Sequence, residues 1–182
     1  MKTNYHKLYL TELEKIKQSG KKPTLLLHSC CGPCSTACIE RLKEYLDITI
    51  LYYNPNIEPL EEYEKRKSEQ IRFINEFKGK NAINFMDIDY DNVTYRNFVV
   101  GLENEAEGGE RCDKCFLLRL EKTAKLAKEN KYEYFGTTLT VSPYKNHLKI
   151  NAIGEELSKK YNIKFLYSDF KKQNGYKNSI EL

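Results

Sequence analysis

The chain has 182 residues, of which 40% are hydrophobic and 31% are charged, and its net charge of +4 neither requires nor excludes a nucleic-acid partner. No apolar run approaches the ~18 residues that a membrane span requires, and the polar N-terminal segment has no apolar signal core. We therefore expect a cytoplasmic protein with no membrane partner, where clustered cysteines bind metal or do chemistry more often than they form disulfides.

Helical and strand patterns alternate along the sequence. A helix is expected at about residues 5–18, and short apolar runs typical of buried strands then alternate with segments of helical periodicity. The strands are expected at residues 24–28, 48–53, 84–88, 132–138 and 164–170. The later helices are expected at residues 35–46 with Ser35 as N-cap, 60–77 opened by Pro59, from Tyr95 onward, 114–130 and 145–162. This alternation predicts one α/β domain over residues 1–182, a three-layer fold with a parallel sheet between two layers of helices.

The carboxyl ends of the expected strands carry the polar and sulfur-containing residues. Cysteines follow the first strand, and Asn54 and Asn56 follow the second. Ser142, Lys145 and Asn146 follow the fourth. Because the carboxyl ends of parallel strands meet at one edge of a sheet, and ligands bind there, we expect the metal and the active site at this edge.

The six cysteines form two groups. The segment HSCCGPCSTAC contains Cys30, Cys31, Cys34 and Cys38, and the segment RCDKC contains Cys112 and Cys115. Cys38 lies four residues after Cys34 on the same helical face, and we expect it to be a small buried residue rather than a ligand. The CGPC sequence between a strand and a helix is typical of a thioredoxin-like redox dithiol, with Pro143 in the role of the cis-proline. That interpretation leaves Cys30 and the second Cys-x-x-Cys pair unexplained.

A metal site accounts for more of the cysteines. Two Cys-x-x-Cys pairs can hold one zinc ion, but the pairs are much further apart than the ~15–20 residues usual for zinc sites, and five candidate thiols exceed four ligands. An iron–sulfur cluster accepts thiolates from distant segments and accommodates the fifth thiol. The iron–sulfur interpretation is therefore favoured. A thiol–disulfide oxidoreductase on Cys31 and Cys34 and a zinc-stabilised RNA-binding module stay open as alternatives.

Four ordered motifs, from about Leu25 to the end of the chain, resemble one known family. They are LLLHSCCGPCS, YYNPNIEPLEEYEKR, GLENEAEGGERCDKCFLLRL and GTTLTVSPYKNHLKIN, and the family is the cobalamin-independent epoxyqueuosine reductases of the QueH type. The resemblance implies a Rossmann-like fold of the nucleotide alpha-hydrolase-like (HUP-like) group. It also implies the last step of queuosine biosynthesis, in which an epoxide on a tRNA anticodon nucleoside is reduced to an alkene. The family's cysteine-containing C-terminal tail is not seen in this sequence, which stops at Leu182: either the protein lacks the tail or the sequence is shortened.

The same resemblance implies the cofactors and the electron source. These are a [4Fe–4S] cluster with a further iron beside it, no cobalamin, and an electron donor of the ferredoxin or flavodoxin type. The expected cluster ligands are Cys30, Cys31, Cys112 and Cys115. Cys34 is expected to bridge to the second iron and to take part in catalysis. Asp113 is a candidate proton donor or oxygen ligand, with a solvated acid at a helix start as the alternative.

Polar residues at the same edge are candidates for substrate binding. Asn54 and Asn56 are expected to contact the edges of the nucleoside, with turn formation as the alternative. Ser142, Lys145 and Asn146 are expected to orient the substrate or meet a phosphate, with helix capping as the alternative.

Aromatic and basic residues complete the expected site. An anticodon base must be splayed out and stacked, and the candidate rings are Tyr52, Tyr53 and Tyr144. His28 is expected to support the site through a hydrogen bond or by packing rather than as a ligand. The basic runs are interleaved with acids, so we expect solvated helix faces from which some side chains contact tRNA phosphates.

Overall fold

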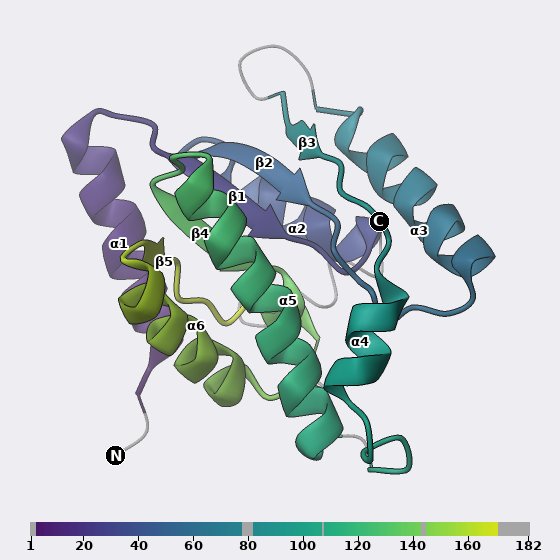
Figure 1. Ribbon diagram of the computed structural model, residues 1–182. Helices are drawn as coiled ribbons and strands as arrows, with labels where there is room; N and C mark the ends of the chain where they lie inside the picture. The colour runs from purple at the N-terminus through teal and green to yellow at the C-terminus, as the bar shows by residue number, and fades with distance from the viewer. Residues whose placement is uncertain (1–2, 78–81, 107, 143–144, 171–182) are drawn as a thin grey trace.

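The fold is organised around a parallel sheet. In the computed structural model, which describes residues 3–77, 82–106, 108–142 and 145–170, five strands pair in the order β3-β2-β1-β4-β5 (Figure 1). The strands are β1 Thr24–His28, β2 Asp47–Leu51, β3 Asn84–Met86, β4 Tyr134–Thr137 and β5 Lys164–Phe165. Every pairing is parallel, and the order reverses between β1 and β4, as in doubly wound Rossmann-like folds. The predicted α/β fold is confirmed.

Helices cover both faces of this sheet (Figure 1). They are α1 Tyr5–Ser19, α2 Gly32–Leu42, α3 Leu60–Ile74, α4 Asn92–Phe98, α5 Glu110–Glu129 and α6 His147–Tyr161, with a short 3-10 helix, η2, at Leu139–Val141. Side chains of α1, α2 and α3 form the apolar core on one face, and side chains of α5 and α6 form the core on the other. The sheet is therefore the middle of three layers, as predicted.

Strand β1 shows why its sequence is apolar without alternation. Leu25 and Leu27 point into the core beside α1 and α2, whereas Leu26 points into the core beside α5 and α6. All three side chains are fully buried. Because both faces of a central parallel strand are covered, every position needs an apolar side chain, and the run LLL satisfies both cores.

Three helices begin earlier than the sequence predicts: α4 begins at Asn92 rather than at Tyr95, and the other two changes involve cysteines. Helix α2 begins at Gly32 with Cys31 at the N-cap, and the hydroxyl of Ser35 donates to the carbonyl of Gly32 at 2.7 Å instead of capping the helix. Helix α5 begins at Glu110 rather than at residue 114, because the extended backbone of Gly109 supplies the N-cap position. Both cysteine groups thus lie at helix N-termini, at the carboxyl edge of the sheet.

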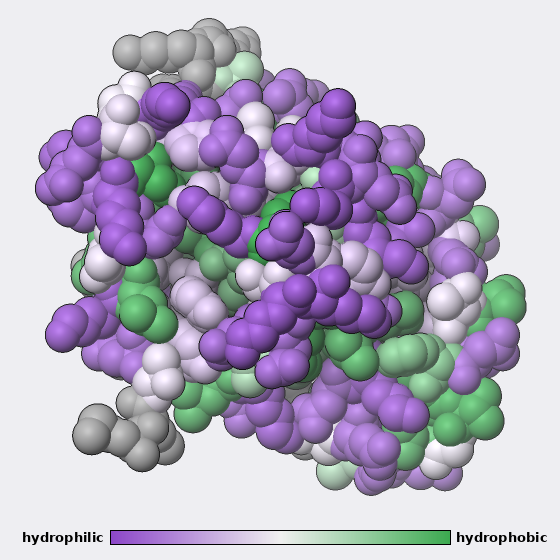
Figure 2. Space-filling model, turned by 60° about the vertical axis from the view of Figure 1, so that its left-hand side comes forward, coloured by the Kyte–Doolittle hydropathy of each residue, from purple (hydrophilic) through white to green (hydrophobic). Residues whose placement is uncertain are grey.

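The face of the molecule that Figure 2 shows is mainly hydrophilic. In the view of Figure 2, hydrophilic side chains cover most of the face, and hydrophobic ones show in smaller areas between them. Within the described residues, no helix combines the length and the apolar character needed to cross a bilayer.

The close approach of α6 to β5 gives a stability prediction. A β-carbon at Gly154 would overlap the ring of Phe165, a buried residue. Helix propensity alone would make Gly154→Ala stabilising by about 1 kcal/mol. Overpacking of a core costs about 1–3 kcal/mol, so we expect a net decrease in the free energy of unfolding, measured by urea denaturation. Adding Phe165→Leu to Gly154→Ala should recover part of the loss; a Gly154→Ala protein more stable than the parent would contradict the described packing.

Candidate metal centre

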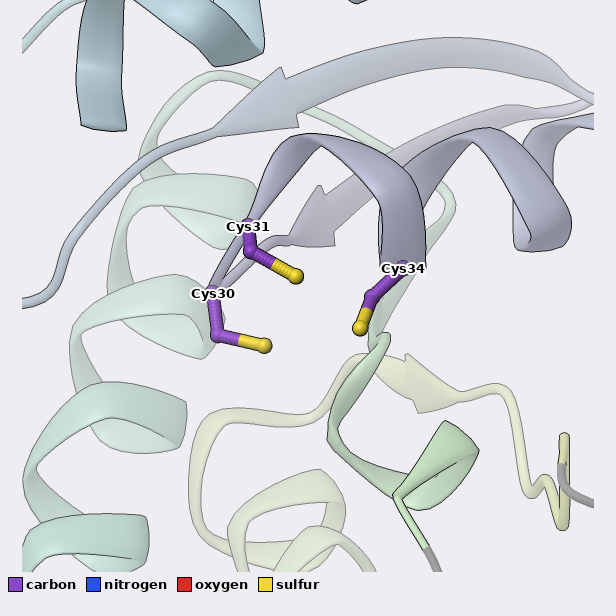
Figure 3. Close-up of side chains that lie close together, drawn as sticks. All are labelled: Cys30, Cys31 and Cys34. Carbon is purple, nitrogen blue, oxygen red and sulfur yellow. The ribbon is translucent and has the colours of Figure 1, made fainter. Parts of the chain in front are cut away.

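Three thiols converge in the loop and first helical turn after β1. The sulfur atoms of Cys30, Cys31 and Cys34 all lie within 4.8 Å of one another, and Figure 3 shows them pointing into a common space. Thiolates on one tetrahedral metal ion, with bonds of about 2.3 Å, stand about 3.8 Å apart. The spacing therefore fits ligands of a common metal atom with little rearrangement. Of the described His, Cys, Asp and Glu side chains, this is the group of three that meets the spacing.

A buried polar network fixes the backbone of this loop. Ser29 donates to the side-chain oxygen of Gln70, and the amide of Gln70 donates to the hydroxyl of Ser35 at 2.7 Å. All three side chains are fully buried. Helix α3, which contributes Gln70, thereby ties the loop after β1 to the first turn of α2, and the thiols project from a fixed frame.

Hydrogen bonds among the three thiols separate their acidities. Bonds from Cys31 and Cys34 hold the pKa of Cys30 well below its usual range, in opposition to its burial. The hydrogen bond to Cys30 raises the pKa of Cys31 to about 12, and it also raises the pKa of Cys34. One thiolate is thus held by two neighbouring protons. A metal ion would replace those protons, because thiolates and not thiols are metal ligands.

The second cysteine pair lies beside the first group. Cys112 and Cys115 occupy the first two turns of α5 and line a cavity of about 310 Å³. The three early cysteines line an adjoining cavity of about 300 Å³. The two cavities share three lining residues, which are Asn56, Arg119 and Lys145. Five soft thiol donors on two adjoining cavities fit a metal centre that extends beyond one tetrahedral ion.

Arg119 is a site residue that the sequence analysis missed. Its side chain is only 5% exposed and lines both cavities. It donates to the side-chain oxygen of Asn54 at 3.3 Å and to the backbone carbonyl of Cys115 at 3.4 Å. The available signal was a cation four residues after Cys115, on the same face of the helix, between the apolar residues Leu118 and Leu120.

His28 supports the site and is not available as a ligand. Its Nε2 donates to the carbonyl of Tyr53 at 2.9 Å, so its Nδ1 accepts from the hydroxyl of Thr137 at 3.1 Å. Burial lowers its pKa to about 4, which keeps the ring neutral. This agrees with the predicted supporting role. Cys38 is likewise buried in the apolar core beside Ile39, as predicted.

The two asparagines after β2 lie in different environments. The amide of Asn54 donates to the carbonyl of Ser29 at 2.8 Å, and its oxygen accepts from Arg119, so its polar groups join β1, β2 and α5. The side-chain oxygen of Asn56 is buried and has no hydrogen-bond partner among the described residues. Asn56 itself lines both cavities, whereas substrate contact for Asn54 would compete with its structural bonds.

The remaining predicted residues surround the same cavities. Ser142 lines the cavity of the three early cysteines, and Asn146 and Asp113 line that of Cys112 and Cys115. Asn146 caps α6 by accepting from the backbone N–H groups of the next turn at 3.0 and 3.2 Å. Asp113 forms an ion pair with Lys149 at 3.2 Å. The structure thus brings these residues to one edge, and their contacts to substrate stay predictions.

Two of the predicted stacking rings are buried. Tyr52 is 1% exposed and Tyr53 is 4% exposed, so neither presents a face to a splayed base, and this prediction is wrong. In the sequence alone, a tyrosine at the end of β2 that packs in the core cannot be told from one that forms an exposed stacking platform. Tyr144 and Pro143 lie outside the described residues. Tyr95 of α4 instead lines the cavity of Cys112 and Cys115 and the neighbouring one.

Comparison with known proteins places this arrangement in a family. The family model described as epoxyqueuosine reductase QueH matches residues 25–182. Proteins named epoxyqueuosine reductase QueH share 43% identity in Staphylococcus epidermidis and 42% in Streptococcus pyogenes. Both alignments cover 100% of this chain, and they cover 78% and 72% of the relatives. A relative of the same name from Thermotoga maritima is 34% identical over 87% of this chain and 81% of its own length.

The matched range contains both cysteine groups and every residue that lines the two cavities. The chain therefore belongs to the QueH family of epoxyqueuosine reductases.

Proposed function

We propose that this protein is an epoxyqueuosine reductase acting on tRNA. It removes the epoxide oxygen of epoxyqueuosine in the anticodon as water, with two electrons and two protons, and leaves the alkene of queuosine. The observation that carries the proposal is the gathering of five thiols around two adjoining cavities at the carboxyl edge of the sheet, in a chain of the QueH family. We further propose a cytoplasmic location and an electron donor of the ferredoxin or flavodoxin type.

The proposed cofactors are a [4Fe–4S] cluster and an adjacent iron, without cobalamin. The cluster ligands in this proposal are Cys30, Cys31, Cys112 and Cys115. Cys34 would bridge to the adjacent iron, and its sulfur lies within 4.8 Å of those of Cys30 and Cys31. When bound, such a centre supplies electrons one at a time and a Lewis-acidic iron for the epoxide oxygen.

The chain's own residues bind the nucleoside and handle the proton. The unpaired side-chain oxygen of Asn56 accepts a hydrogen bond from the base, and Lys145 supplies positive charge where the cavities meet. Ser142 and Asn146 orient the substrate from the loop after β4. Asp113 lines the cavity of Cys112 and Cys115. In its ionised form it pairs with Lys149 at 3.2 Å, and in its protonated form it delivers that proton to the leaving oxygen.

The metal content provides the first test. Anaerobically reconstituted protein should contain about four to five irons with acid-labile sulfide. Cys112→Ala/Cys115→Ala should lose most of both, as measured by iron and sulfide assays. Cys38→Ala is the matched control, because Cys38 is buried in the core away from both cavities. One tightly held zinc, or a metal-free protein that reduces insulin disulfides, would instead favour an alternative class.

Turnover provides the second test. Iron-loaded, reduced protein is incubated with tRNA that contains epoxyqueuosine, and the nucleosides are analysed by mass spectrometry. We expect conversion to queuosine, and a rate about 10²- to 10⁴-fold lower for Asp113→Asn, which removes the general acid. Glu121→Gln is a control, since Glu121 pairs with Lys160 and lines neither cavity. If the epoxide stays unchanged in the presence of iron-loaded protein and a strong reductant, the proposed reaction is contradicted.

The stacking platform can be tested at Tyr95. We propose that this ring stacks on the splayed base, because it lines the cavity of Cys112 and Cys115. Stacking of a base on an aromatic ring contributes about 1–3 kcal/mol, so Tyr95→Ala should raise KM for the tRNA about 5- to 150-fold. Tyr95→Phe keeps the ring and should have nearly the parent KM. Equal losses in the two variants would show that the hydroxyl group, and not stacking, matters.

A further inference from the structure

We infer that Arg119 is the built-in positive counter-charge of the metal centre and that it raises the centre's reduction potential. The inference rests on the proposed function, because it requires an iron–sulfur centre between the two cysteine groups. Arg119 is a positioning residue in this scheme, since it acts through the centre and not on the substrate.

The first observation is a buried cation without a protein anion. The side chain of Arg119 is 5% exposed, and no carboxylate pairs with it among the described residues. Its partners are the oxygen of Asn54, the carbonyl of Cys115 and the ring of Phe116, whose centroid is 5.8 Å from the guanidinium carbon. A buried charge without a counter-charge is strongly destabilising. A negative partner is therefore expected beside it.

The second observation is the position of the guanidinium between the two groups of thiols. Arg119 lines both the cavity of Cys30, Cys31 and Cys34 and that of Cys112 and Cys115. Metal-bound thiolates at both cavities would supply the missing negative charge.

The other cations that line the cavities are held differently. Arg66 pairs with Glu62 at 2.8 Å, and Arg111 donates to the backbone carbonyl of Glu103 at 2.6 Å. Lys149 is 46% exposed and already pairs with Asp113. Lys145 also lines both cavities but belongs to the loop before α6, whereas Arg119 projects from the middle of a 20-residue helix. Asn54, itself bonded to Ser29, fixes the end of the guanidinium. Arg119 is therefore the cation whose position is set by the fold.

A fixed positive charge changes the energy of the reduced centre. Each electron added to a thiolate-bound cluster adds one negative charge to a poorly solvated site. A nearby cation stabilises that charge more strongly than water-screened surface charges do. Arg119 therefore favours the reduced state, and a donor of given potential reduces a larger fraction of the protein.

The test is a redox titration of reconstituted protein with dithionite and mediator dyes, followed by electron paramagnetic resonance. Arg119→Gln removes the charge but keeps an amide that can bond to Asn54. We expect the ratio of reduced to oxidised centre at a fixed potential to fall about tenfold, which is about 59 mV for a one-electron couple. Arg119→Lys keeps the charge and should stay within about threefold of the parent. Lys149→Gln, which removes the exposed cation, should also stay within about threefold of the parent ratio.

A second variant keeps the inference testable if Arg119→Gln does not load iron. Asn54→Asp leaves Arg119 in place but gives it a carboxylate partner, so the ratio should fall in the same direction. Loaded Arg119→Gln or Asn54→Asp protein with the parent ratio would overturn the role of Arg119 and leave the proposed function intact. If the ratio of reduced to oxidised centre fell equally in Arg119→Lys, the proposed role of the Arg119 charge would also be overturned. Parent protein that binds no iron would contradict the proposed function itself.

Discussion

Parallel pairing of β1 with β2 on one side and with β4 on the other determines where the chemistry of this protein lies. The strand order reverses between β1 and β4, so the segments that follow these strands diverge to opposite faces, and residues of both segments line a cavity at their carboxyl ends. The sulfur of Cys30 lies 3.9 Å from the hydroxyl of Thr138 in this cavity. Helices α2 and α5 start at the same edge, and each carries cysteines into it.

The helix N-termini add to the electrostatics of the thiols. Neither α2 nor α5 has a side-chain cap, and the sulfur of Cys112 accepts a hydrogen bond from the backbone N–H of Gly108 at 3.4 Å. Backbone N–H groups and the positive end of a helix dipole favour thiolates over thiols. Arg119 adds a full charge from the far side. The fold thus prepares this edge for anionic sulfur through features of two separate segments, the start of α2 and residues 108–119.

The sequence allowed the sheet and the edge to be predicted, because the alternation of apolar runs with helical periodicity and the places of the cysteines after β1 are local patterns. The helix starts were misplaced, because Ser35 and Lys114 look like helix starts in the sequence. The sequence does not show that Ser35 donates to the Gly32 carbonyl or that Gly109 has the extended backbone of an N-cap. The burial of Tyr52 and Tyr53 depends on packing between layers, which no local pattern records. The place of Arg119 at the site could not be predicted, because it depends on the packing of α5 against the loop that follows β2, where Arg119 donates to Asn54.

The unpaired oxygen of Asn56 has a consequence for molecular discrimination. A buried acceptor that lacks a donor costs about 1–3 kcal/mol of stability. A bound ligand offsets this cost only if it donates an N–H or O–H to that oxygen. A ligand of the same shape with an acceptor at that point would place two lone pairs against each other. It would therefore bind more weakly than a ligand with an apolar group there. In the proposed function, the site would therefore favour a ligand that donates a hydrogen bond to Asn56 over one that presents an acceptor or an apolar group there.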